Sequence, residues 1–267
     1  MLKLLYITNN DRVALAAERS GVNRIWIDLE VLGKEQRQKN LNTVKSAHTV
    51  EDIKRIAPLL EKSDLLVRIN PWNENSKKEI DEVVDAGADI VMLPYWKTKE
   101  EVFNFVTYLN GRCRSLLLLE TKEAVEKLES VLEIEGIDEI HIGLNDLRLS
   151  YGFKDMFEPF ANGLLDRLSD AIKNVGIPFG IGGIGQFGLG LSPSPEELIA
   201  EHYRLGSTAV ILSRTFCNAE KLGDIDLIEK TLTENIKLLR KTEVWASKLD
   251  KKGYEDNHSL VVKALEG

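Results

Sequence analysis

Strand-like runs and helix-like stretches alternate eight times along this chain, and this alternation restricts the possible folds more than any other feature. The strand-like runs are rich in β-branched and large apolar residues, and Gly, Pro, Asn or Asp bound them. Between them, apolar residues recur with the spacing of an amphipathic helix. Strands that alternate with helices in this way are parallel and joined by right-handed crossovers, and eight such units close into a (β/α)₈ TIM barrel.

The predicted elements account for most of the sequence. We expect strands at 4–8, 24–29, 65–69, 89–93, 115–120, 139–143, 178–181 and 209–213. We expect helices at 11–19, 50–60, 76–86, 99–109, 122–132, 157–174, 195–205 and about 226–249. The connections at 31–48 and 182–194 are long for such a barrel, and loops at the C-terminal ends of the strands are where barrels keep their chemistry.

The length of 267 residues suits a single barrel domain, so we predict one domain over residues 1–267. Residues 216–267 form the last helix and a tail, which is predicted as a helical extension of the barrel. The apolar segment Leu260-Val261-Val262 would pack on the chain itself or on a neighbouring subunit.

Charge and composition exclude several classes of function. The net charge of −8 disfavours binding to nucleic acid, which requires clustered Lys and Arg. No apolar run approaches the roughly 20 residues of a membrane-spanning helix, and no export signal follows Met1. The two widely separated cysteines are typical of a reducing compartment, so we predict a cytoplasmic protein without membrane partners.

Acidic side chains follow several of the predicted strands. Glu120 ends the fifth strand and Asp146 follows the sixth, while Asp28 and Glu30 follow the second. Because successive strand ends meet at one mouth of a barrel, these carboxylates would repel each other unless a cation lies between them. Two direct carboxylate ligands favour Mg²⁺ or Mn²⁺, which also bind waters or substrate oxygens.

Arg68 ends the third strand and adds a positive charge to the same mouth. Its planar guanidinium is suited to a carboxylate or phosphate. A metal ion beside an arginine fits an anionic 2-oxo acid, because the metal polarises the carbonyl group and stabilises an enolate.

Five segments, in order, resemble the signature segments of the HpcH/HpaI aldolase and citrate lyase β-subunit family. They are Ile27-Asp28-Leu29-Glu30, Val67-Arg68-Ile69-Asn70-Pro71, Asp89-Ile90-Val91-Met92-Leu93-Pro94, Leu119-Glu120-Thr121-Lys122-Glu123-Ala124-Val125-Glu126 and Gly143-Leu144-Asn145-Asp146-Leu147. The resemblance covers about residues 24–152. It implies that Glu120 and Asp146 bind the metal, that Arg68 holds the 2-oxo acid, and that the protein is a homo-oligomer, often a trimer or hexamer.

Further site residues are predicted around this centre. Asn145, beside Asp146, and Gly182 and Gly183, after the seventh strand, are predicted to contact the substrate. The glycine-rich segment 180–188 either binds phosphate through its backbone or forms a wall over the site, and we favour the wall. Asp28 and Glu30 are predicted to hold Arg68 or metal-bound waters.

One position departs from the family pattern. In the pyruvate-dependent aldolases a His directly follows the acid after the second strand, whereas this chain has Val31. His48, at the end of the same long connection, is the predicted substitute, because imidazole titrates near neutral pH. His48 or a metal-bound water would then move the proton.

These residues predict a metal-dependent carbon–carbon lyase, a class II aldolase that joins a 2-oxo acid such as pyruvate to an aldehyde. An acyl-CoA lyase of the citrate or malyl-CoA type is an alternative, with Lys34, Arg37 and Lys39 as its basic patch. A non-catalytic binding barrel is a second alternative. Structural roles also remain open: Glu120 and Asp146 as helix caps, Arg68 as an ion-pair partner, and His48 as a surface residue.

Overall fold

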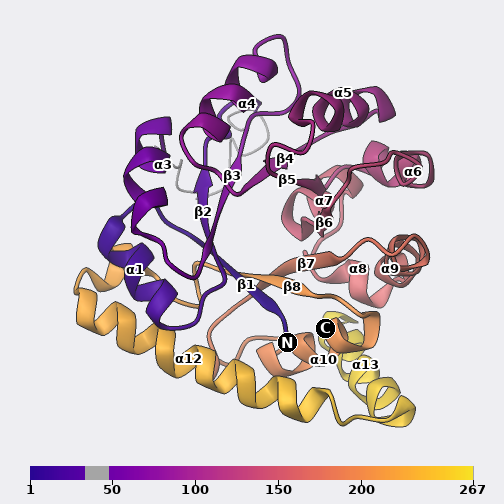
Figure 1. Cartoon of the computed structure of the whole chain (residues 1–267). Coiled ribbons are helices and arrows are strands. Elements are labelled where there is room, and N and C mark those ends of the chain that lie inside the picture. The colour runs from indigo at the N-terminus through magenta and orange to yellow at the C-terminus, as the bar shows by residue number, and fades with distance from the viewer. Residues whose placement is uncertain (34–47, 267) are drawn as a thin grey trace.

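The predicted barrel is confirmed in the computed structural model, which describes residues 1–33 and 48–266. Eight parallel strands pair in sequence order, and the last pairs with the first, so the sheet is closed (Figure 1). The strands are β1 (Lys3–Ile7), β2 (Arg24–Asp28), β3 (Asp64–Arg68), β4 (Ile90–Leu93), β5 (Arg114–Leu119), β6 (Glu139–Ile142), β7 (Phe179–Ile184) and β8 (Ala209–Leu212).

Helices surround the barrel and connect its strands. They are α1 (Asp11–Arg19), α3 (Val50–Ile56) with the 3₁₀ turn η1 (Ala57–Leu59), α4 (Ser76–Asp85), α5 (Lys99–Leu109), α6 (Lys122–Val131), α7 (Leu144–Tyr151), α8 (Glu158–Ala161), α9 (Leu164–Asn174), α10 (Pro195–Leu205), α11 (Ala219–Leu222), α12 (Ile225–Ala246) and α13 (Lys251–Glu266). Three predicted helices, α1, α5 and α10, have the expected bounds.

Several local predictions were wrong. The single helix expected at 157–174 is divided into α8 and α9 at Gly163, whose φ of +77° is a left-handed conformation that favours glycine. Helices α7 and α11 were not among the predicted elements, whereas α13 confirms the predicted helical extension at the C-terminal end of the barrel. Strand β7 continues to Ile184, so it includes part of the segment predicted as a loop.

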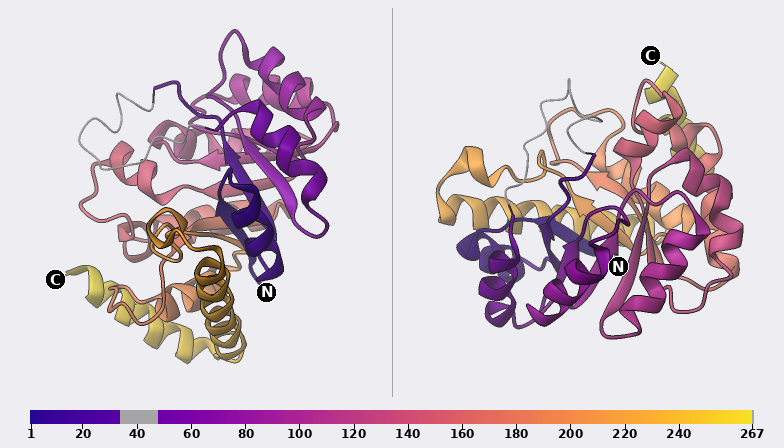
Figure 2. Two further views of the ribbon diagram at one scale, coloured as in Figure 1. Left: turned by 90° about the vertical axis from the view of Figure 1, so that its left-hand side faces the viewer. Right: turned by 90° about the horizontal axis from the view of Figure 1, so that it is seen from above.

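The C-terminal helices lie on one side of the barrel (Figure 2). Helix α12 packs against α1 and α10, and α13 packs against α10 and α8. The carboxylate of Glu201 on α10 is buried and binds α13 through Asn257 Nδ2 at 3.2 Å and His258 Nδ1 at 3.1 Å. The tail is therefore attached to its own barrel in this structure.

The barrel interior is built in layers. An apolar cluster in this interior consists of Leu5, Trp26, Leu66, Ile90, Met92, Leu116, Leu118 and Ala209. Because side chains alternate along a strand, the residues two positions later face the same interior at its C-terminal end. These residues include Asp28 after Trp26, Arg68 after Leu66, and Glu120 after Leu118.

The N-terminal end of the interior is charged as well. The side chain of Arg24 on β2 lies within the barrel and forms two hydrogen bonds with Glu139 on β6, on the opposite side of the sheet. Lys3 Nζ also contacts Glu139, at 3.2 Å.

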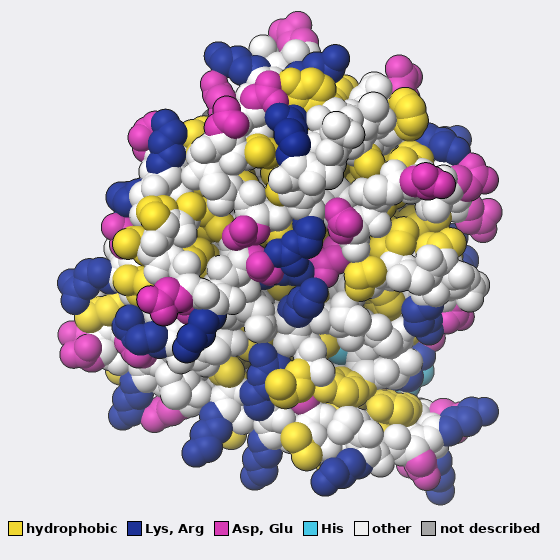
Figure 3. All heavy atoms as spheres, viewed as in Figure 1, with side chains coloured by type: hydrophobic (Ala, Val, Ile, Leu, Met, Phe, Trp, Pro, Cys, Tyr) yellow, Lys and Arg dark blue, Asp and Glu magenta, His cyan; other side chains and the backbone are white. Residues whose placement is uncertain are grey.

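On the face drawn in Figure 3, basic and acidic side chains lie close together near the centre. Across residues 1–33 and 48–266, none of the helices combines the length and apolar character needed to span a bilayer.

Candidate active site

Arg68 lies at the centre of the polar group at the C-terminal mouth. Its Nε and Nη2 atoms each donate to Asp28, to Oδ1 and Oδ2, at 2.8 Å. Glu30 Oε2 lies 3.3 Å from Nη2. The expected contacts of Asp28 and Glu30 with Arg68 are therefore present, and they occupy one edge of its guanidinium.

The surroundings of Arg68 keep it charged. Burial alone would lower its pKa, but the carboxylates of Asp28, Glu30 and Glu120 raise it above the usual value. The guanidinium also stacks over the ring of Trp26, with 5.0 Å between its carbon and the ring centroid. Within the described residues, Nε and Nη2 have hydrogen-bond partners, and Nη1 has none. Arg68 can therefore offer Nη1 to a ligand without disturbing Asp28.

Glu120 is buried at the end of β5 and is held from two sides. The backbone N–H of Tyr95, which follows β4, donates to its Oε1 at 3.1 Å. On the other side, a Cβ atom placed on Gly143 would lie only 2.9 Å from Oε2. Because Gly143 is the N-cap of α7, Glu120 Oε2 faces the first turn of that helix.

Asp146 lies in this same first turn of α7, and its side chain is nine-tenths buried. Its Oδ1 atom is buried and has no hydrogen-bond partner among the described residues. An unpaired buried carboxylate oxygen is costly unless a cation or proton satisfies it. Asn145, the preceding residue, is partly exposed at the same helix end.

The oxygen donors at this mouth fit a hard divalent cation. Glu120 Oε2 lies beside Gly143 at the start of α7, Asp146 lies in the first turn of the same helix, and such oxygens are the ligands that Mg²⁺ and Mn²⁺ prefer. Across residues 1–33 and 48–266, no group of three or more His, Cys, Asp or Glu side chains is close enough to hold a metal. A metal at this mouth would therefore depend on two protein carboxylates and on water or substrate.

The geometry does not support the predicted role of His48 as a base. The backbone N–H of Asp28 donates to His48 Nδ1 at 2.9 Å, so Nδ1 is unprotonated and the ring proton of the neutral imidazole is on Nε2. In this tautomer Nε2 can donate a hydrogen bond but cannot accept a proton. His48 does lie at the mouth, beside the end of β2, as expected.

Of the two glycines predicted to contact substrate, Gly182 has a structural role. Gly182 and Gly183 belong to β7 and not to the loop that follows it. Gly182 is buried with a φ of +38°, and a Cβ atom there would lie 2.4 Å from Leu144 Cδ1. Packing against α7 thus explains this glycine without a ligand. Gly183 is partly exposed and remains a candidate for substrate contact.

The long connection after β2 begins with a well-defined turn. Asn70 Oδ1 accepts hydrogen bonds from the backbone N–H groups of Val31 and Leu32, both at 2.9 Å. Asn70 Nδ2 in turn donates to Glu79 Oε1 at 2.8 Å. The basic residues Lys34, Arg37 and Lys39, suggested for binding CoA, lie outside the described residues.

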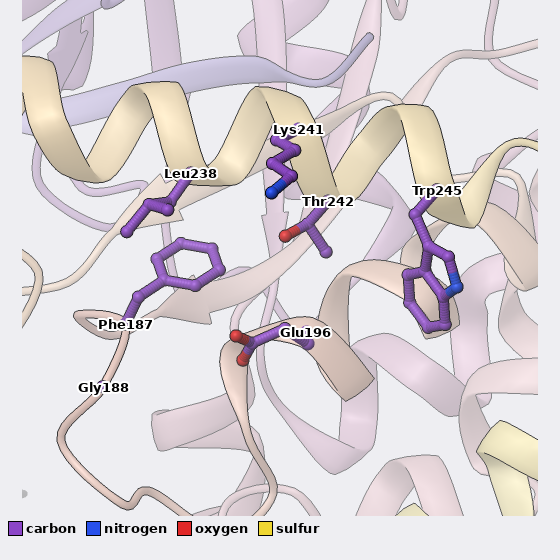
Figure 4. Close-up of a pocket in the computed structure, with 7 residues that line it drawn as sticks. All are labelled: Phe187, Gly188, Glu196, Leu238, Lys241, Thr242 and Trp245. Carbon is purple, nitrogen blue, oxygen red and sulfur yellow. The ribbon is translucent and has the colours of Figure 1, made fainter.

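A cavity of about 580 Å³ lies away from this mouth, between α12, the loop after β7 and the start of α10 (Figure 4). Its lining residues are Phe187, Gly188, Glu196, Leu238, Lys241, Thr242 and Trp245. Its lining contains no cluster of carboxylates and none of the predicted site residues. We therefore do not assign the active site to this cavity.

Three residues shape the mouth through contacts that the sequence did not predict: Tyr95, Gly143 and Trp26. The contact of Tyr95 uses a backbone N–H group, which every residue type except proline would supply. Gly143 appeared in a quoted motif, yet the close approach of Glu120 that requires a glycine is visible only in three dimensions. The contact of Trp26 with Arg68 had one sequence signal: Trp26 lies two residues before Asp28, so the two side chains face the same side of the strand.

Comparisons of sequence identify the family and several related proteins. A sequence model described as HpcH/HpaI aldolase/citrate lyase matches residues 4–159, more than half of the chain. A hydroxypyruvate/pyruvate aldolase of Sagittula stellata is 24% identical over 41% of this chain and 54% of its own length. A 2-keto-3-deoxy-L-rhamnonate aldolase of Salmonella paratyphi B is 29% identical over 31% of this chain and 42% of its own. The chain thus spans about half the length of the curated relatives it matches.

Comparisons of structure cover almost the whole chain. An HpcH/HpaI aldolase of Desulfitobacterium hafniense has a TM-score of 0.62 and 16% identity, over 94% of each chain. The citrate synthase SbnG also has a TM-score of 0.62 and 16% identity, over 86% of this chain and 93% of its own. At such low identity these similarities show the shared fold alone.

Proposed function

The chain belongs to the HpcH/HpaI aldolase/citrate lyase family, and from that premise we propose that it is a metal-dependent class II aldolase acting on a hydroxy-2-oxo acid. The observation that supports this most is the pair of carboxylates at the start of α7. Asp146 Oδ1 is buried without a partner, and Glu120 Oε2 faces the same helical turn. Arg68 is on the same mouth, with Nη1 available to an anion.

The first proposed role is that of the metal ligands. Glu120 and Asp146 would hold Mg²⁺ or Mn²⁺, since both are buried oxygen donors at one helix start. When bound, the metal would polarise the 2-oxo group of the substrate and stabilise the negative charge that develops on its oxygen. The N-terminus of α7 adds the positive end of a helix dipole to the same place.

Arg68 is the proposed carboxylate-binding residue. Asp28 fixes the plane of its guanidinium through two hydrogen bonds, and Trp26 supports the opposite side. Nη1 would then donate to the carboxylate of the 2-oxo acid, while Asn145 and Gly183 contribute polar contacts at the rim. A clamp through the Nε and Nη2 edge is not available, because Asp28 occupies it.

The proton transfer of the aldol reaction needs an acceptor. His48 Nε2 would act as a neutral hydrogen-bond donor to a substrate oxygen, which stabilises developing charge without transferring a proton. Of the two predicted proton acceptors, His48 and a bound water, the water is therefore the proposed one. It would take the hydroxyl proton when the carbon–carbon bond breaks and return a proton to the enolate carbon, which gives the 2-oxo acid product.

The relatives narrow the proposed substrate class. One is named for hydroxypyruvate and pyruvate, and the other for 2-keto-3-deoxy-L-rhamnonate, so both names specify 2-oxo acids. We extend this class to the present chain, with a hydroxylated aldehyde as the second reactant. A cytoplasmic homo-oligomer in which residues 216–267 contribute to contacts between subunits also remains a proposal.

The assay is a retro-aldol measurement on a panel of hydroxy-2-oxo acids, with pyruvate release followed after removal of metal and after addition of Mg²⁺ or Mn²⁺. We expect cleavage that requires added metal, and an Arg68→Lys variant whose KM rises about tenfold or more, because Lys keeps the charge but lacks the planar donors. Cleavage of an acyl-CoA thioester alone would favour the acyl-CoA lyase. Binding without turnover of any substrate would favour the non-catalytic barrel.

A further inference from the structure

Tyr95 has a backbone conformation that non-glycine residues rarely adopt. Its φ is +50°, and in the described part of the chain Asn110 is the other non-glycine residue with a positive φ. Asn110 ends helix α5 as a left-handed C-cap, which is a common place for this conformation. Tyr95 ends no helix, so its unfavourable backbone needs another explanation.

Contacts on both sides of Tyr95 account for this conformation. Its own N–H donates to Glu120 Oε1 at 3.1 Å, and the carbonyl of the next residue, Trp96, accepts from Thr121 Oγ1 at 3.0 Å. Trp96 is also fully buried in the core. The positive φ at Tyr95 lets the chain satisfy both contacts and connects the end of β4 to two successive residues after β5.

The side chain of Tyr95 has a separate environment. Its ring is partly exposed and lies beside Lys97, whose Nζ is 5.2 Å from the ring centroid. The contact with Glu120 therefore belongs to the backbone of Tyr95.

Gly143 lies against the Glu120 side chain on the side opposite to Tyr95. Its φ of −85° is allowed for any residue, so backbone strain does not explain the glycine. A Cβ atom there would lie 2.9 Å from Glu120 Oε2, 3.0 Å from Glu120 Cβ and 3.2 Å from Leu118 Cδ1. Because Gly143 has no side chain, the Glu120 carboxylate can occupy its observed position without a steric clash.

We propose that the backbone N–H of Tyr95 and the bare Cα of Gly143 are positioning groups that fix the Glu120 carboxylate with Oε2 toward Asp146. This inference rests on the proposed function, in which Glu120 is a metal ligand. With two protein carboxylates, the direction of each one has a large influence on affinity, because Mg²⁺ requires near-ideal octahedral geometry. Groups that orient metal ligands typically change metal affinity 10- to 100-fold when they are removed.

Mn²⁺ binding to the metal-free protein, measured by electron paramagnetic resonance without substrate, tests the position of Gly143. We expect Gly143→Ala to weaken Mn²⁺ binding at least tenfold. Gly253→Ala is the matched control, since it adds the same methyl group on α13, 3.0 Å from Leu249 Cδ2. The control should bind Mn²⁺ as the wild type does.

The backbone role of Tyr95 needs variants that separate its N–H from its ring. Tyr95→Gly keeps the N–H and tolerates positive φ, so its Mn²⁺ affinity should stay within about threefold of the wild type. Tyr95→Pro removes the N–H and excludes positive φ, so it should lose at least tenfold. Asn110→Gly relieves the same type of backbone conformation away from the mouth and should leave the affinity unchanged.

A double-mutant cycle keeps the test valid if one variant folds poorly. Glu120→Asp shortens the side chain and makes room at Gly143, so its effect and that of Gly143→Ala should be less than additive. Wild-type affinity in both Gly143→Ala and Tyr95→Pro, or a tenfold loss in Tyr95→Gly, would overturn this inference and leave the proposed function intact. A wild type that binds no Mn²⁺ would reject both.

Discussion

Arg68 and Asp28, at the C-terminal ends of neighbouring strands β3 and β2, share two hydrogen bonds of 2.8 Å each. This pair is almost fully buried and directs the remaining guanidinium nitrogen, Nη1, away from Asp28. The Nε and Nη2 edge of the Arg68 guanidinium is thus already bound to Asp28. This edge is not available for a bidentate contact with the substrate. The available donor geometry, and not the charge alone, determines what Arg68 can bind.

Replacing Asp28 tests this pair. Asp28→Asn should raise the KM for the 2-oxo acid about tenfold and lower the free energy of unfolding by on the order of 3 kcal/mol, because a buried charge loses its partner. Urea unfolding and steady-state kinetics measure the two effects. Asp81→Asn breaks the exposed pair with Arg112 and should lower the free energy of unfolding far less, because water screens an exposed pair. Equal costs for the two variants would contradict the structural role of Asp28.

Replacing Asp146 tests the metal-binding carboxylate. Asp146→Ala should abolish metal-dependent turnover without unfolding the chain, because Oδ1 accepts no hydrogen bond from the described residues. Circular dichroism melting checks the fold, and the retro-aldol assay checks the activity. The exposed Asp170→Ala provides the control, with unchanged turnover expected. Normal activity in Asp146→Ala would refute the site assignment.

The ion pair at the other end of the barrel should support stability and not catalysis. Glu139→Gln removes the carboxylate that accepts two hydrogen bonds from the buried guanidinium of Arg24 and leaves only Asp64, 3.8 Å from Nε, among the described residues, so the free energy of unfolding should fall by roughly 3–5 kcal/mol. The kcat of the folded fraction should not change, because the barrel core separates Glu139 from the mouth. A kcat that falls in proportion to stability at low temperature would contradict this separation.

Two buried histidines predict how stability depends on pH. Burial lowers the pKa of His141 to about 4 and that of His202 to about 3, so both are neutral when folded. The unfolded chain binds these protons near pH 6.5, so their stabilising effect is complete above that pH and falls as the pH decreases. Each group should contribute a slope of up to about 1.4 kcal/mol per pH unit. Between pH 6 and 5, His202→Asn should reduce the measured slope; an unchanged slope would contradict the prediction.

The barrel itself could be predicted from the sequence because its signals are local and repeat. Apolar runs and helix caps recur at regular spacing, and parallel strands place their ends together. Thr98 and Thr121 cap α5 and α6 through side-chain hydrogen bonds, as their positions before acidic residues indicate. By contrast, α7 was missed because it begins directly after β6 and is short, with no polar cap at Gly143.

The candidate site could be predicted only in part. The positions of Arg68, Asp28, Glu120 and Asp146 followed from strand order, since each lies at or just after a strand end. The tautomer of His48 and the contact of Tyr95 depend on backbone N–H groups, and every residue except proline carries one. Side-chain identity therefore could not reveal either of them.

A crystal structure with Mn²⁺ and pyruvate, with the metal located by anomalous scattering, tests the central claim most directly. We predict one Mn²⁺ within roughly 2.1 Å of an oxygen of both Glu120 and Asp146, with the pyruvate carboxylate near Arg68 Nη1. A metal bound elsewhere, or carboxylates that point apart with pyruvate outside the mouth, would contradict it.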